Sequence, residues 1–250
     1  GFPDLFKQSV KEAQTLPQTF IPTPEDWTPV NRLDQDVWAL SAYSNDDAGR
    51  NIDLWNLRNG KVGHRWVVPS NEVPVKPHWR IHHPLLLEDR SVVSFITNRS
   101  PLFRLDSASQ MVWRQDSLSF HHAINLDAQG QIWACVMQWE RGGQHIAYRG
   151  SYTMDQKKVH FLDNSIARID PENGRITYLK SCADILRDNG LEHLILRSGD
   201  PQDPLHLNDV EPALFGGPFF EEGDLFLSFR NLQAVLHFRP STGEVVQVID

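Results

Sequence analysis

The chain is poor in the features that mark several protein classes. It has only two cysteines and three methionines among 250 residues. No apolar run approaches the roughly 20 residues of a membrane-spanning helix, and no charged segment followed by an apolar stretch opens the chain. Cys135 and Cys182 form no C-x-x-C motif, so they predict either one disulfide in an oxidising compartment or two buried thiols. The first residue is Gly1, from which we expect a processed or excerpted product whose targeting segment is not shown.

Positive charge is also scarce. The 24 basic side chains are outnumbered by 32 acidic ones, which gives a net charge of −8 and a pI of about 5.7. Because no stretch clusters Lys and Arg, we expect neither nucleic acid nor a membrane surface as a partner. An anionic substrate would need a local positive site. The 40% hydrophobic and 22% charged residues describe an ordinary folded protein and argue against disorder.

The chain divides into two unequal parts. Residues 1–31 are rich in proline and contain one weakly amphipathic stretch, Asp4 to Thr15, which predicts a leader with a short helix. From Asp36 onward the sequence consists of short alternating or apolar runs punctuated by turn residues, which is typical of an all-β protein. We therefore expect a single β domain over residues 32–250.

Two landmarks repeat along this domain. In the first, an apolar residue, a turn and a second apolar residue follow in a fixed order, with glycine at the sixth position in three of four cases; the four octets are Trp55 to Val62, Leu105 to Val112, Ile169 to Ile176 and Phe238 to Val245. In the second, a polar turn precedes the apolar pairs Val92-Val93, Ile132-Trp133 and Leu225-Phe226. The spacing from Val92 to Leu105 equals that from Leu225 to Phe238. This repeated pattern predicts four-stranded blades of a β-propeller, about four of them in this chain.

Three departures from the repeat carry predictions of their own. Gln110 replaces the turn glycine and predicts a turn of different shape. The step from Ile132 to Ile169 is longer than in the other units, which indicates an insertion near Glu140 to His160. Ser181 and Asp184 resemble a capping box, with Gly190 placed to end the helix, and residues 197–205 are expected to form a loop.

Histidine is abundant, with 11 residues, and several recur at similar blade positions: His82, His83, His121, His122 and His206. The first strand of a propeller blade lines the central channel, so these imidazoles are predicted to meet at one mouth of that channel. A hydrogen-bonded structural role is the alternative for each of them. Binding of a metal by a histidine of this set with Asp209 and Glu211 is a further option, but no tight metal-binding spacing is present, so we assign neither a metal nor another cofactor.

A resemblance to a known family rests on a few segments: Asp203 to Pro212, Leu227 to Asn231, His121 to Gly130 and Asp163 to Gly174. They are similar to the D-x-x-H-x-N, S-S-R and H-H-D elements of bacterial arylsulfate sulfotransferases, which are six-bladed propellers. The resemblance is good over residues 120–250 and only generic over 36–115. It implies transfer of a sulfuryl group from a phenolic sulfate ester to a phenol, in a periplasmic or membrane-anchored protein.

The resemblance also implies roles for individual residues. His122, His206 and Arg230 are the expected catalytic residues that contact the sulfate, and His121, Asn208 and His83 are expected to bind substrate. The chain departs from the family at Ala123, where a carboxylate is lost, and at Asp209, which replaces serine. The attacking histidine is expected beyond Asp250, with four of six blades present here.

Other interpretations of the sequence remain open. Trp133, Trp139 and Phe229 are candidates for stacking on a phenol, or else simply pack between blades. The insertion and the lost carboxylate favour a non-catalytic binding propeller. A quinone-dependent dehydrogenase is a third possibility, and oligomeric state is not readable from the sequence.

Overall fold

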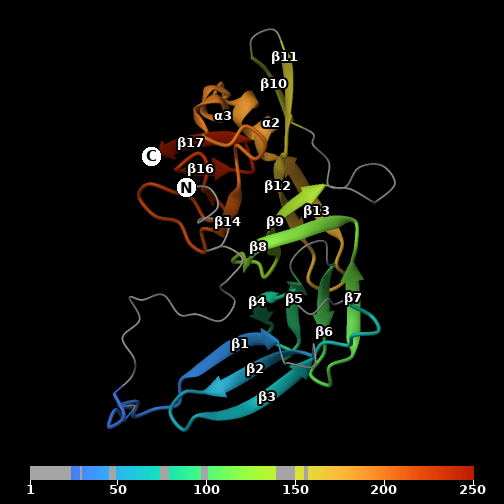
Figure 1. Ribbon diagram of the computed structural model, residues 1–250, viewed down its shortest axis with the longest axis vertical. Coiled ribbons are helices and arrows are strands. Elements are labelled where there is room, and N and C mark those ends of the chain that lie inside the picture. The colour runs from blue at the N-terminus through green and yellow to red at the C-terminus, as the bar shows by residue number, and fades with distance from the viewer. Residues whose placement is uncertain are drawn as a thin grey trace, which may run out of the picture.

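The computed structural model describes residues 24–28, 30–44, 49–73, 79–96, 101–138, 150–154 and 157–250. The predicted leader helix and Trp139 lie outside these residues. In the described part the strands form antiparallel sheets that succeed one another in chain order from the bottom to the top of Figure 1. The expected all-β architecture is confirmed. Neither of the helices described below is long and apolar enough to cross a membrane.

The sheets have the predicted blade topology. The first contains β1 (Trp38–Ser44), β2 (Arg50–Asn56) and β3 (Lys61–Val67). The second contains β4 (Ile81–Leu86), β5 (Val92–Ile96), β6 (Leu102–Leu105) and β7 (Met111–Gln115). The third contains β8 (Leu118–Leu126), β9 (Ile132–Gln138), β12 (Asn164–Ile169) and β13 (Ile176–Ser181). The fourth contains β14 (Leu207–Pro212), β15 (Leu225–Phe229), β16 (Ala234–Arg239) and β17 (Glu244–Ile249).

One irregularity recurs in all four sheets, at the octets marked in the sequence. The pairing register shifts at the hairpin that each octet forms: at Leu54/Trp55, Arg104/Leu105, Arg168/Ile169 and His237/Phe238. These hairpins join the third and fourth strands of the later sheets. In the first sheet the same shift joins β2 and β3, so β1 corresponds to a second strand, and the described residues of that sheet include no first strand.

The insertion in the third sheet is a second hairpin. Its strands are β10 (Gly150–Met154) and β11 (Lys157–Phe161), which pair only with each other and stand above the third sheet in Figure 1. The ladder then resumes with β12, which pairs with β9. The predicted interruption of the third unit is therefore confirmed over its described residues.

The hairpin turns of the four octets have the backbone that their glycines predict, and the turn with Gln110 differs from the other three. Gly60, Gly174 and Gly243 have φ of 66°, 72° and 78°, a region that residues without a side chain occupy at little cost. In the turn with Gln110, the left-handed residue is Ser109 instead, at φ 64°. That turn closes through a hydrogen bond from Ser109 N–H to the Asp106 carbonyl, so it is one residue shorter, as the missing glycine predicts.

The helical connection lies between the third and fourth sheets. Helix α2 (Cys182–Asp188) is capped by Ser181, whose hydroxyl accepts a 3.0 Å hydrogen bond from the Asp184 N–H, and Gly190 follows its end at φ 69°. Both cysteines are free and buried here, which settles the alternatives in favour of two thiols. A short helix α3 (His193–Arg197) was not foreseen, because five residues give too little periodicity to predict.

The core lies between consecutive sheets. One cluster joins β1–β3 to β4–β7, a second joins β4–β7 to β8–β13, and a third joins that sheet to β14–β17 and α2. Phe95, Phe103, Phe120 and Phe238 have no exposed surface. This packing brings the inner strands β4, β8 and β14 side by side, which is the arrangement that positions the histidines.

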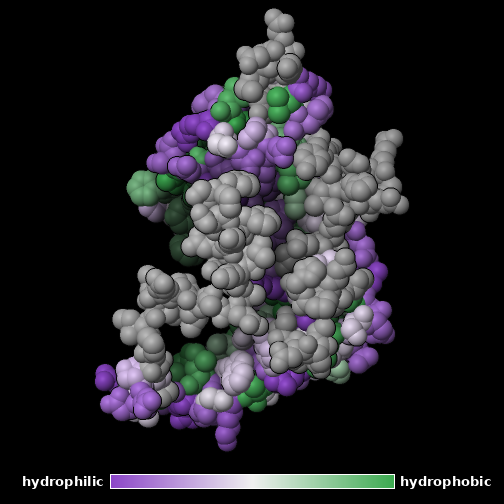
Figure 2. All heavy atoms as spheres, in the orientation of Figure 1, coloured by the Kyte–Doolittle hydropathy of each residue, from purple (hydrophilic) through white to green (hydrophobic). Residues whose placement is uncertain are grey.

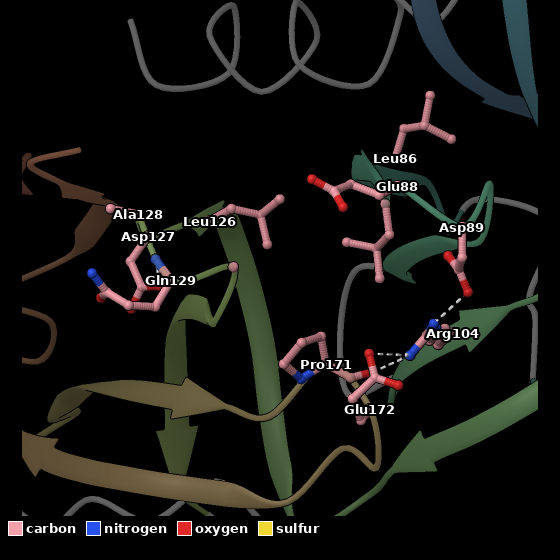
Figure 3. A pocket seen from close by; sticks show the side chains of 12 residues that line it. Leu86, Glu88, Asp89, Arg104, Leu126, Asp127, Ala128, Gln129, Pro171 and Glu172 are labelled. Atoms are coloured by element: carbon pink, nitrogen blue, oxygen red, sulfur yellow. Dashed lines mark hydrogen bonds and ion pairs between the residues drawn. The ribbon is translucent and has the colours of Figure 1, made fainter.

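Each four-stranded sheet contains one equivalent ion pair. A carboxylate in the turn between the first and second strands binds an arginine of the third strand: Asp89 with Arg104 at 2.6 Å, Asp127 with Arg168 at 2.8 Å and Asp224 with Arg239 at 2.8 Å. In Figure 3, Arg104 extends between Asp89 and Glu172 in a pocket that Leu126 and Asp127 border from the neighbouring sheet. The guanidinium of Arg104 donates its hydrogen bonds to groups of the protein. We therefore assign this pocket a structural role and not a binding role.

The fourth sheet adds a histidine and an exposed loop. His237 Nε2 lies 2.7 Å from Asp224, so one histidine without an assigned role is structural. Burial alone would raise the pKa of Asp224, but Arg239, the Glu221 N–H and His237 together hold it below its ordinary value. The loop after β14 exposes Leu214, Phe215 and Phe219 at the end of the strand remote from His206. Figure 2 shows hydrophobic residues on the left side of the molecule, where Figure 1 draws this loop.

Removing the negative charge of Asp224 tests this structural assignment. The variant Asp224→Asn leaves Arg239 and the buried His237 without their carboxylate, and should lower the free energy of unfolding by about 3 kcal/mol in urea titrations at pH 7. The exposed pair of Lys180 and Asp188 supplies the control, because Asp188→Asn should change stability by less than about 1 kcal/mol. Equal effects of the two substitutions would contradict the structural role.

Candidate functional site

The inner strands carry an unusual backbone at their histidines. His83, His122 and His206 have φ of 42°, 58° and 49°, a left-handed region that side chains other than glycine rarely occupy. Strand pairing is irregular beside each of them, at His82/Leu85, Phe120/Ile124 and Leu207/Asp209. Strained positions of this kind concentrate at functional sites.

The histidines of two neighbouring inner strands are in contact. The ring centroids of His122 on β8 and His206 at the start of β14 are 5.1 Å apart, and those of His121 and His122 are 5.2 Å apart. His121 is buried, whereas the side chain of His122 is exposed. His83 lies one strand further, where its Nδ1 is 3.4 Å from the Ile124 carbonyl oxygen of β8.

A carboxylate orients His206. Asp203 Oδ2 lies 2.5 Å from Nδ1 of His206, three residues away in the chain, and Nη2 of Arg230 lies 3.3 Å from the same nitrogen. Since one nitrogen cannot both donate to the carboxylate and accept from the guanidinium, the shorter contact defines Nδ1–H as a donor to Asp203. Nε2 of His206 is then the atom left for chemistry.

The turn that holds Asp203 and His206 is fixed by two asparagines. Asn164 of β12 accepts a 2.8 Å hydrogen bond from the Leu207 N–H through Oδ1. Asn231 donates a 2.6 Å hydrogen bond to the Asp203 carbonyl and accepts one of 3.1 Å from Nε of Arg230. Asn164 and Asn231 therefore hold the backbone of this turn from other segments, and Asn231 also positions the guanidinium of its neighbour Arg230.

A hollow of about 400 Å³ opens beside these groups. Its lining comes from the three inner strands, namely His82, His83, His122, Ala123, Asn208 and Asp209. The structure thus brings His83, His122 and Asn208 onto one hollow and places His206 and Arg230 next to its His122 wall. His121 is in contact with His122 but lies behind it in the core.

Unsatisfied polar atoms gather at the same place. In the described part of the chain, six buried side-chain nitrogen or oxygen atoms lack a hydrogen-bond partner within the protein, and five belong to this cluster: His82 Nε2, His121 Nε2, Asp203 Oδ1, His206 Nε2 and Asn208 Oδ1. A buried polar group without a partner costs about 1 to 3 kcal/mol. Such a concentration points to a polar ligand that would supply the missing partners.

Three imidazoles of the cluster, those of His82, His121 and His122, disfavour a positive charge. Burial, followed by the neighbouring His122, lowers the pKa of His121 to about 3. Burial also lowers the pKa of His122, with His206 and Arg230 acting in the same direction, and burial with His83 lowers that of His82. These three rings are neutral at pH 7, so the permanent positive charges near the cluster are those of Arg230, beside His206, and Arg80, whose charge acts on His82.

Sequence reasoning missed two residues of the cluster. Asp203 stands in the D-x-x-H spacing that marked the segment, so that spacing was the available signal. His82 was noted but not assigned to the site. The stacking candidates Trp133 and Phe229 are instead core residues: Phe229 is 2% exposed, and the Trp133 indole donates to Asp127 at 3.2 Å.

The metal option finds no support in the geometry. Asp203, rather than Asp209 or Glu211, is the carboxylate that binds His206. Within the ranges that the structure describes, no three His, Cys, Asp or Glu side chains are arranged to hold a metal ion.

The neutral state of buried His121 predicts a pH dependence of stability. An unfolded imidazole takes up a proton near pH 6.5, whereas folded His121 resists it until about pH 3, so protonation favours the unfolded chain as pH falls through this window. His121 should therefore cost about 2 kcal/mol of stability between pH 7 and pH 5. Urea titrations of His121→Leu should show that much less acid sensitivity, and the exposed His193→Leu variant should match wild type. Equal acid sensitivity of wild type and His121→Leu would contradict this assignment.

Comparison with known proteins gives the family. A comparison with curated proteins finds no match. Among solved structures, the chain is similar to a Bacteroides caccae protein of unknown function, with 11% identity, coverage of 90% of this chain and 85% of that one, and a TM-score of 0.29. It is also similar to catalytically inactive virginiamycin B lyase from Staphylococcus aureus with quinupristin, with 13% identity, 83% and 71% coverage and a TM-score of 0.34. The family described as arylsulfotransferase (ASST) matches residues 83–248, which span the three four-stranded sheets and the histidine cluster, and the chain belongs to that family.

Proposed function

We propose that the protein transfers a sulfuryl group from a phenolic sulfate ester to a phenol, at the hollow between the three inner strands. The observation that carries this proposal is the group of buried polar atoms without partners around His206, Asn208 and His82. The oxygens of a sulfate monoester can accept hydrogen bonds from the nitrogens among these atoms, His82 Nε2 and His206 Nε2, whereas Asn208 Oδ1 can accept one from the hydroxyl of the phenol. The family membership supports the same reaction class.

Each residue then has a distinct task. Arg230 binds nonbridging oxygens of the sulfate through its planar guanidinium, and His122 and Asn208 contribute further hydrogen bonds. His206 uses Nε2 to pass a proton to the departing phenolate, while Asp203 stabilises the imidazolium that exists before the transfer. His121 lies behind His122 and fixes its position, and His83 borders the far side of the hollow.

The reaction balances without a nucleotide or a metal. The bond between sulfur and the donor's phenolic oxygen breaks, and a bond from sulfur to the acceptor oxygen forms. The leaving phenolate takes a proton from His206, and the acceptor's hydroxyl proton replaces it on His206. The transition state spreads negative charge over the sulfuryl oxygens, so positioning and electrostatic stabilisation supply the catalysis. A route through a sulfo-histidine would divide the transfer into two steps. Its nucleophile beyond Asp250 stays a prediction, and so does a periplasmic location.

A binding propeller without activity is the second candidate. Ala123 on the wall of the hollow supplies no acid–base group, and the β10–β11 hairpin projects from the third sheet as a binding element could. Both candidates predict binding of an aryl sulfate, and only the enzyme predicts turnover. The assay below separates them.

Transfer from 4-nitrophenyl sulfate to phenol tests the proposal through the absorbance of released 4-nitrophenolate. Arg230→Ala and His206→Ala should each lower kcat/KM by about 10² to 10³, the scale for removing one group that stabilises transition-state charge. The control is the exposed His193→Ala on α3, which should retain wild-type activity. Absence of transfer by the folded protein with a series of phenols would rule out the enzyme, and retained aryl sulfate binding would then favour the binding propeller.

Asp203 gives a second test because it acts through His206. Asp203→Asn keeps the size of the side chain but removes the charge that stabilises the imidazolium, so kcat should fall about 10²-fold while KM for the donor changes less. A donor with a better leaving group needs less proton transfer and should be less affected by the substitution. A uniform loss across donors of different leaving-group pKa would contradict this role.

A further inference from the structure

The charge around the hollow changes sign along strand β14, which follows His206. Arg230 lies at one end, against His206, and the neutral His122 follows. Beyond Asn208, strand β14 presents Asp209 on the hollow and Glu211 two residues later. Because alternate side chains share one face of a strand, these two carboxylates lie on the same face.

Asp209 is held in place with one oxygen still available. Its Oδ1 accepts a 2.9 Å hydrogen bond from Nδ2 of Asn125 on β8 and another of 2.9 Å from the Val210 N–H. Asn125 also donates to the Val210 carbonyl at 3.0 Å, so the amide fixes β14 against β8. Oδ2 has no hydrogen-bond donor among the described residues, and a ligand can therefore use it.

No described lysine or arginine neutralises this end of the hollow. The ion pairs of the described residues include neither Asp209 nor Glu211. The basic group that faces Glu211 is the imidazole of His83. Burial, followed by Asp209, raises the pKa of Glu211, which shows that the two carboxylates repel each other. A cation placed between them would relieve that repulsion, and an anion would increase it.

We propose that Asp209 on the hollow, with Glu211 beyond it on the same face of β14, selects phenolic acceptors that carry a positively charged group over those that carry a carboxylate. This inference rests on the proposed sulfuryl transfer and names its acceptor class as phenolic amines. The sulfate binds at the Arg230 end, the phenol ring lies along the hollow beside Ala123, and the ammonium group meets Oδ2 of Asp209. A hollow of about 400 Å³ falls within the usual range for small-molecule sites.

The experiment compares acceptors of equal size and different charge on the full chain. With 4-nitrophenyl sulfate as donor, kcat/KM is measured for tyramine, 4-ethylphenol and 4-hydroxyphenylpropionate. Wild type should prefer tyramine to 4-ethylphenol by about tenfold, the scale of one close charge pair, and should use the carboxylate least. Ratios within each protein are compared, so a general loss of activity does not affect the result.

Matched substitutions assign the preference to residues. Asp209→Asn keeps an oxygen for Asn125 but removes the charge, and should lower the tyramine to 4-ethylphenol ratio about tenfold. The double variant Asp209→Asn with Glu211→Gln should bring the ratio of tyramine to 4-hydroxyphenylpropionate close to one. Glu244→Gln on the outer strand β17 makes the same change in net charge as Asp209→Asn alone and should keep the wild-type ratios. A wild type without charge preference, or a double variant with unchanged ratios, would overturn the proposal.

Equilibrium binding separates this inference from the proposed function. Isothermal titration calorimetry measures tyramine and 4-hydroxyphenylpropionate binding without a donor, in wild type and in Asp209→Asn. If no phenol is sulfated but tyramine binds more tightly than the carboxylate and loses that advantage in Asp209→Asn, the transfer reaction is wrong and the charge selection stands. If transfer occurs with equal use of the three acceptors, the transfer reaction stands and the charge selection is wrong.

Discussion

The left-handed backbone at His83, His122 and His206 is the constraint on which the site depends. A regular inner strand would send successive side chains to alternate faces of its sheet. Each positive φ instead coincides with a shift in register, so a histidine leaves the ladder, and two of these histidines, His83 and His122, line the hollow. Such positions cost about 1 to 3 kcal/mol each. The packed cores between the sheets and the asparagine hydrogen bonds around Leu207 and Asp203 offset that cost and keep the geometry.

The ion pairs and the histidine cluster lie at different ends of the inner strands. At the turn end of each inner strand, carboxylates bind arginines within the same sheet, and those charges have partners. Near the histidines the opposite holds, because buried nitrogen and oxygen atoms lack partners and burial keeps the rings of His121 and His122 neutral. The same repeated sheet therefore places satisfied charges at one end and unsatisfied polar groups towards the other. This contrast, rather than the number of histidines, identifies the functional end.

Much of the fold could be predicted from the sequence because its signals are local. The octets specify hairpins through glycine at positive φ, and the capping box specifies α2, so neither depends on distant residues. The backbone at His122 could not be predicted in this way, since nothing in the local sequence favours a left-handed histidine. The burial of individual histidines could not be predicted from the local sequence either. His121 and His122 are adjacent and identical in sequence, yet one lies in the core and the other at the hollow.

The two departures from the family pattern become one feature once the strands are placed together. Ala123 on β8 lacks the carboxylate of the H-H-D element, and Asp209 on β14 has one where the family has serine. Both residues line the same hollow, and Asn125, two residues after Ala123, binds Asp209 directly. The hollow thus has a carboxylate on β14 in place of the one that the resemblance implies on β8, next to the groups proposed to bind sulfate. In the sequence the two changes are 86 positions apart, from 123 to 209, so only the pairing of the inner strands shows that the charge of the hollow is kept while its position changes.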